Sequence, residues 1–113
     1  MGDRANILFK QINGDKIYFY THWDGRNLPN TLQKALRRGE DRWDDEQYLA
    51  RIIFCEMVQG DVLSNTGYGI STYEGDNQHP LLIVDVGKQE VQCGEHSWSF
   101  KEFIKDPIPI TVY

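Results

Sequence analysis

Cysteine is scarce in this sequence, and the two cysteines present, Cys55 and Cys93, are far apart along the chain. Neither belongs to a Cys-x-x-Cys pair, and neither has a histidine at zinc-finger spacing, so a disulfide framework and a structural metal site are not expected. We predict two free thiols, both mostly buried.

Long hydrophobic runs are also missing, since no stretch approaches the roughly 18 apolar residues that cross a bilayer. The start, Met-Gly-Asp-Arg, lacks the apolar core of a secretory signal, and we expect a cytoplasmic protein without membrane partners.

Positive charge is in short supply. The chain has 12 Lys plus Arg against 17 Asp plus Glu, a formal net charge of −5. Its summed field repels a polyanion, so duplex nucleic acid is not an expected partner. Hydrophobic residues make up 40% of the 113 residues and charged residues 26%, which is typical of one globular domain spanning residues 1–113.

The local signatures of common enzyme classes are absent. There is no Gly-x-Ser-x-Gly elbow, no His-Glu-x-x-His helix and no Cys-x-x-Cys redox pair. The run Thr66-Gly67-Tyr68-Gly69 lacks the Lys-Ser/Thr of a phosphate-binding loop and is not followed by a helical pattern. We expect no cofactor and no metal, and we predict that the glycines leave Tyr68 free to cover a pocket.

The N-terminal third predicts a β-hairpin. Residues 4–12 and 16–22 are rich in Ile, Phe and Tyr and flank Asn13-Gly14-Asp15, a turn sequence suited to positive φ. Alternation places four side chains in the core, namely Ile7, Phe9, Ile17 and Phe19. Tyr18, Tyr20 and His22 are then expected together on the opposite face.

Two helices follow in the prediction. The spacing of apolar residues indicates an amphipathic helix over 28–38, with Asn27 as a candidate N-cap and Gly39 just past its end. Asp44 is the predicted cap of a second helix that ends near Val58. Apolar residues occupy nearly the whole circumference of this second helix, so we expect it either to be covered on both sides or to form a subunit interface.

The remainder predicts strands over 67–73, 80–86 and 90–93 and a short helix over 99–105 capped by Ser99. The run 81–84 is the expected central strand. The apolar tail 106–113 is expected to add an edge strand or contact another subunit. The order β-β-α-α-β-β-β-α favours an α+β fold, an antiparallel sheet of about five strands with helices on one face.

The densest polar cluster is Thr21-His22-Trp23-Asp24-Gly25, where a predicted strand runs into a loop. His22 could act as a general base or ligand, with Asp24 orienting it. The structural alternative is that Trp23 anchors the loop while His22 bonds to the backbone.

Three arginines are further candidates. Arg42 beside Trp43 could hold a phosphate and a base together, or could form a structural stack with Arg42 bonded to Asp41. Arg51 lies on the apolar second helix and needs a partner, for which a carboxylate such as Glu56 or Asp85 is favoured over a ligand. Arg4, at the start of the first strand, is a similar case.

Several segments carry a resemblance. The stretches MGDRANI, YFYTHWDG, DRWDDEQYLARIIFCEM, GYGIST and PLLIVDV resemble a family of small proteins from bacterial and phage genomes. That family has no known activity, so the resemblance implies no substrate or catalytic residue. A phage connection favours proteins that bind host molecules or sequester nucleotide signals used in host defence.

The leading hypothesis is a non-enzymatic homo-oligomer that binds a small anionic ligand of nucleotide type, with phage anti-defence as the role. The predicted ligand-binding residues are Arg4, Tyr20, His22, Trp23, Arg42, Trp43, Arg51 and Tyr68. An alternative is an inhibitor or adaptor that contacts a host protein through its acidic surface and apolar tail. A third is a small hydrolase that uses His22.

Overall fold

Six strands and three α-helices make up the structure, a computed structural model that describes residues 2–110 and 113. The strands are β1 (Ala5–Lys10), β2 (Lys16–Thr21), β3 (Tyr68–Ser71), β4 (Leu82–Asp85), β5 (Glu90–Cys93) and β6 (His96–Ser99). The helices are α1 (Leu28–Arg38), α2 (Glu46–Met57) and α3 (Phe100–Phe103), with two 3-10 turns, η1 (Gly25–Asn27) and η2 (Glu40–Arg42).

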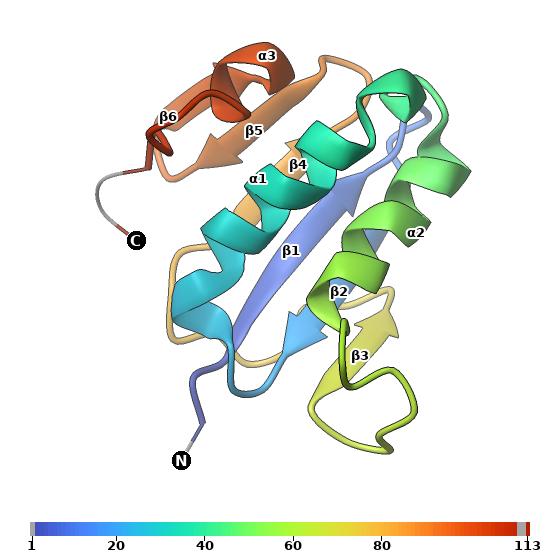
Figure 1. Ribbon diagram of the computed structural model, residues 1–113, viewed down its shortest axis with the longest axis vertical. Helices are drawn as coiled ribbons and strands as arrows, with labels where there is room; N and C mark the ends of the chain where they lie inside the picture. Colours follow the sequence, from blue (N-terminus) through green and yellow to red (C-terminus); the bar gives the residue numbers. More distant parts are fainter. Residues whose placement is uncertain (1, 111–112) are drawn as a thin grey trace.

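All six strands form one sheet in the order β3-β2-β1-β4-β5-β6 (Figure 1). Neighbouring strands are antiparallel except β1 and β4, which are parallel. The predicted α+β class is therefore confirmed, but the count of about five strands and the fully antiparallel sheet were wrong. β6 was missed because its short segment, HSWS, has no apolar alternation beyond Trp98.

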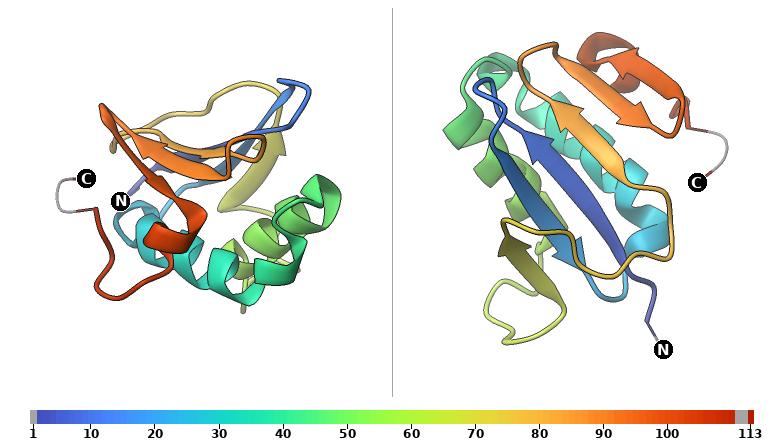
Figure 2. Two further views of the ribbon diagram at one scale, coloured as in Figure 1. Left: turned by 90° about the horizontal axis from the view of Figure 1, so that it is seen from above. Right: turned by 180° about the vertical axis from the view of Figure 1, so that it is seen from behind.

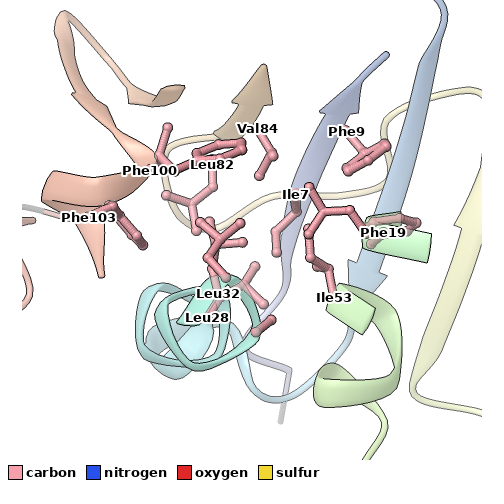
Figure 3. Close-up of a cluster of buried hydrophobic side chains, with 14 of the residues drawn as sticks. Ile7, Phe9, Phe19, Leu28, Leu32, Ile53, Leu82, Val84, Phe100 and Phe103 are labelled. Carbon is pink, nitrogen blue, oxygen red and sulfur yellow. The ribbon is translucent and has the colours of Figure 1, made fainter. Parts of the chain in front are cut away.

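The helices lie on one side of the sheet and leave the other side as an open face (Figure 2). The register places Ile7 between Phe19 and Leu82 on the covered side, where α1 packs Leu28 and Leu32 against them (Figure 3). Ile7, Phe9 and Phe19 are buried as predicted, and Ile17 packs at the border of the same core.

Local helix signals were mostly correct. Ser99 and Glu102 form a reciprocal capping box at α3. At α2, however, the cap is Asp45, which accepts a hydrogen bond from the Tyr48 amide, and not Asp44. α2 buries Leu49, Ile53 and Met57 and leaves its outer side exposed, so it is not covered on both sides.

The tail does not form the predicted extra strand in residues 106–110 or 113, and residues 111–112 lie outside the described part. Ile108, Ile110 and Tyr113 pack against the chain's own core instead. The two thiols differ, since Cys93 is buried as predicted whereas Cys55 is exposed. Within residues 2–110 and 113, none of the helices has the length and apolar character needed to cross a membrane.

Candidate functional site

The predicted site residues fall into separate groups. Arg4, Tyr20, His22, Trp23 and Tyr68 come from the end of the sheet where β1 begins and β2 ends. Arg42 and Trp43 follow the far end of α1, whose 11 residues rise about 1.5 Å each, so roughly 16 Å of helix separates the two groups. The eight residues therefore do not line one concavity.

Trp43 has a structural role. Its side chain is buried, its Nε1 donates to the Leu36 carbonyl at 2.9 Å, and its ring meets Phe100 edge-on with centroids 5.3 Å apart. The prediction that Trp43 stacks on a ligand is wrong, because its ring is buried in the core and its Nε1 is hydrogen-bonded there.

Arg42 and Arg51 also differ from expectation. The Arg42 guanidinium lies 4.7 Å from the centre of the Tyr48 ring and 3.7 Å from Asp45, so it reinforces the start of α2. Arg51 is exposed on the outer side of α2. The two carboxylates predicted as partners of Arg51 form ion pairs with other residues. Glu56 pairs with Arg38, and Asp85 pairs with Lys10.

The remaining aromatic residues do converge. The Tyr20 hydroxyl and His22 Nδ1 are hydrogen-bonded at 3.0 Å on the open face, as alternation predicted. Trp23 meets His22 edge-on at 5.5 Å and Tyr68 edge-on at 6.5 Å. Burial, aided by the charge of nearby Asp24, raises the pKa of Tyr68. These four side chains thus form a continuous aromatic row around the end of the sheet.

A loop covers part of the open face beside this row. Residues 72–81 cross from β3 to β4 over the ends of β2 and β1 (Figure 2). Asn6, fully buried, holds the loop in place: its Oδ1 accepts from the Gly75 amide, and its Nδ2 donates to the carbonyls of Gly75 and Asp76, each at 3.1 Å. Gly75 consequently lies so close to Tyr20 that an added Cβ would be 2.9 Å from the Tyr20 ring.

The loop and the edge of the sheet line an open pocket of about 460 Å³. Its lining residues are Tyr20, Gly69, Ile70, Ser71, Tyr73, Glu74, Gly75 and Asp76. The side chains supply two phenol rings, one hydroxyl and two carboxylates. Neighbouring Arg4 pairs with Asp76 at 3.1 Å, so the carboxylate of Glu74 is the principal net charge at the pocket.

A second polar cluster fastens the N-terminal segment to the same loop. His79 Nε2 and Asp3 Oδ1 are 2.6 Å apart, and the Arg26 amide donates to Asp3 Oδ2 at 2.9 Å. The hydrogen bond from His79, followed by the one from Arg26, lowers the pKa of the Asp3 carboxyl below its ordinary value. No hydrogen bond joins His22 to Asp24 within the described residues, so the histidine–aspartate pair of the predicted hydrolase is not formed there.

Four residues of this region were not predicted from the sequence, namely Asn6, Tyr73, Glu74 and Asp76. The signal available was weak: a polar Asn6 inside an apolar strand, and the turn-like run Glu74-Gly75-Asp76-Asn77. Within residues 2–110 and 113, no group of three or more metal-ligating side chains comes together.

No family model, curated protein or solved structure matches this chain. The resemblance to small bacterial and phage proteins therefore stays a prediction.

Proposed function

We propose that this protein binds a small molecule with a planar nitrogen heterocycle, of nucleobase type, in the pocket between the open face and the loop 72–81. The proposal rests on the hydrogen bonds between the Asn6 side chain and the Gly75 backbone, here called the Asn6 clamp. The clamp holds Gly75 against Tyr20 and so keeps a pocket of about 460 Å³ open beside two tyrosine rings. Ligand pockets in proteins typically measure about 300–1,000 Å³, so the volume suits a nucleoside.

The lining chemistry supports a ring that carries N–H donors. Tyr20 and Tyr73 offer aromatic faces, and stacking of a base on an aromatic ring is worth about 1–3 kcal/mol. The carboxylate of Glu74 can accept hydrogen bonds from ring and exocyclic N–H groups, in the way that carboxylates accept from the amino group of cytosine. Binding by these three side chains requires no reaction, which agrees with a non-enzymatic role.

The charge of the ligand depends on Arg4. Because Arg4 already pairs with Asp76, a phosphate at this position would have to compete with a carboxylate that is part of the pocket. We therefore expect a nucleoside monophosphate to bind no more tightly than its nucleoside. Asp76→Asn should release Arg4 and favour the monophosphate by several-fold. A nucleotide-type anion as natural ligand, a host protein as partner and a role in phage anti-defence stay predictions.

Isothermal titration calorimetry with the four nucleosides and their monophosphates tests the proposal. Tyr20→Phe should keep most of the affinity because the ring stays, whereas Tyr20→Leu and Glu74→Gln should each weaken binding about tenfold or more. Glu95→Gln, at the turn between β5 and β6, is the matched control and should change nothing. Lack of heat with all eight compounds at millimolar concentration, or equal binding by Tyr20→Leu, would refute the proposal.

A further inference from the structure

Five of the seven large hydrophobic side chains that are exposed in the described part of the chain lie on β3 or next to it, at one edge of the sheet. β3 is the last strand at that edge. Large hydrophobic residues on it and next to it are exposed, by 58% at Ile70, 72% at Tyr73, 70% at Val62 and 95% at Leu63. Trp23, exposed by 44%, packs against Gly67 just before the strand. Clustered apolar exposure of this kind marks interaction surfaces.

The outer edge of β3 is free to pair. Its residues bond to β2 on one side, and β3 has no second neighbour within the part of the chain that the structure describes. Soluble proteins usually protect such an edge with a lysine or a proline, and the strand sequence YGIS contains neither.

An apolar groove adjoins this edge. It lies between β3 and the outer side of α2 and has a volume of about 290 Å³. Its lining residues are Ile17, Phe19, Ala50, Arg51, Phe54, Cys55 and Ile70. Figure 1 shows that the loop carrying Val62 and Leu63 leaves α2 and enters β3 at the same edge. One chain thus carries both an apolar groove and an exposed apolar side chain beside it.

We propose that two copies of this chain associate about a two-fold axis through β3, pairing the two β3 strands antiparallel and placing Leu63 of each copy in the groove of the other. Antiparallel pairing brings the Tyr68 end of one strand to the Ser71 end of the other. The loop that precedes Tyr68 then lies over the partner's groove. A two-fold interface requires such mutual contacts, in which residue i meets j and j meets i.

The charges of the two surfaces are complementary in this arrangement. Arg51 lines the groove and has no ion pair within residues 2–110 and 113. Asp61 immediately precedes Val62 and Leu63 and lies near Tyr68, whose pKa it helps to raise. The two-fold arrangement sets each Arg51 opposite the other copy's Asp61, so a second copy fits the surface better than an unrelated apolar strand.

Sedimentation equilibrium of the full chain tests the proposal. We expect twice the chain mass of 13.2 kDa at micromolar concentration. Leu63→Asp and Ile70→Lys should each raise the dissociation constant at least tenfold, while Ile12→Asp, at an exposed position in the turn between β1 and β2, should leave it unchanged. Circular dichroism checks that each variant remains folded.

Exchanging the charges of Arg51 and Asp61 distinguishes the loss of a contact between the two copies from a loss of fold. Arg51→Asp and Asp61→Arg should each weaken the dimer several-fold, and the two together should restore it. A wild-type chain that is still monomeric at about 0.5 mM, roughly 500 times a concentration of 1 μM, would overturn the proposal. So would a dimer that survives both Leu63→Asp and Ile70→Lys, or a failure of the charge exchange to restore association. A strand of a different protein as the natural occupant would show as a monomer in this assay.

Discussion

Asn6 and Gly75 are joined by two reciprocal hydrogen bonds, one in each direction and each 3.1 Å long, although 69 positions separate them in the chain. This pair connects the first strand with the loop that lines one side of the candidate pocket. Since the Asn6 side chain is fully buried, the amide supplies bonds that water cannot replace. The pocket therefore depends on one side chain that does not line it.

Asn6→Ala should lower the free energy of unfolding by about 2–3 kcal/mol, because it leaves three backbone groups of the loop without a partner near the open face. Urea denaturation measures the change. Asn30→Ala, at an exposed position on α1, is the control and should stay within about 0.5 kcal/mol. An unfolding free energy as high as that of the parent would show that the loop is held by other contacts.

Gly67→Ala should destabilise the protein for two reasons. Gly67 has φ +97°, and a Cβ there would lie 2.2 Å from Cζ2 of Trp23. Gly14 has a similar φ of +92° but open space around it. Gly14→Ala should thus cost about 1 kcal/mol for backbone strain alone, and Gly67→Ala about 1–3 kcal/mol more from overpacking.

Thermal denaturation of the two alanine variants measures this difference. The tryptophan fluorescence of Gly67→Ala should also change, because Trp23 must move away from the strand. Equal destabilisation of both variants would contradict the close packing of Gly67 on Trp23.

Stability should fall in acid through Asp3. The hydrogen bonds from His79 and Arg26 lower the folded-state pKa of Asp3 below its unfolded value, so the group releases its proton more readily in the folded protein. The stabilisation that the Asp3 carboxylate contributes is complete at a pH above its unfolded-state pKa of about 3.9. It is lost as the pH falls through the folded-state pKa. Asp3→Asn should therefore flatten the loss of stability below about pH 4, in denaturant titrations at several pH values.

Asp41→Asn is the matched control for this experiment, since Asp41 is exposed on η2. It should leave the pH profile as it is. A profile of Asp3→Asn parallel to that of the parent below pH 4 would argue against a folded-state role for the Asp3 carboxylate.

Trp43 should matter for stability and not for ligand binding. Trp43→Phe removes the donor to the Leu36 carbonyl and should cost about 1–2 kcal/mol, while Trp43→Ala also leaves a cavity beside Phe100 and should cost about 3–5 kcal/mol. Calorimetric titration of Trp43→Phe with a ligand of the parent should give the parent's dissociation constant. A tenfold loss of affinity would show that Trp43 contributes to ligand binding.

The local elements were largely predictable. The β1–β2 hairpin, α1 and the Ser99 cap follow from alternation, helical spacing and capping chemistry, which act within a few residues. The errors lie where short-range signals compete. Asp44 and Asp45 both have side chains suited to cap α2. Asp45 is the cap because of the path that the chain takes after η2.

The candidate site was predictable only in part. Tyr20 and His22 follow from the alternation of one strand, and Trp23 from its position after it. Trp43 looked similar in the sequence, yet it fills the core beside Phe100, 57 positions away. An aromatic residue next to an arginine has the same local pattern in a core and in a binding site, so composition cannot separate the two.

The sequence by itself determined the α+β class, the hairpin, the two main helices and the face on which Tyr20 and His22 lie, because period and capping are local properties of the chain. Tertiary structure alone decided that β4 pairs parallel to β1, that Asn6 clamps Gly75, and that Asp3 meets His79 across 76 positions. Such contacts depend on how the loop 72–81 packs across the open face, and that packing reflects the balance of many side chains rather than the preference of any one segment.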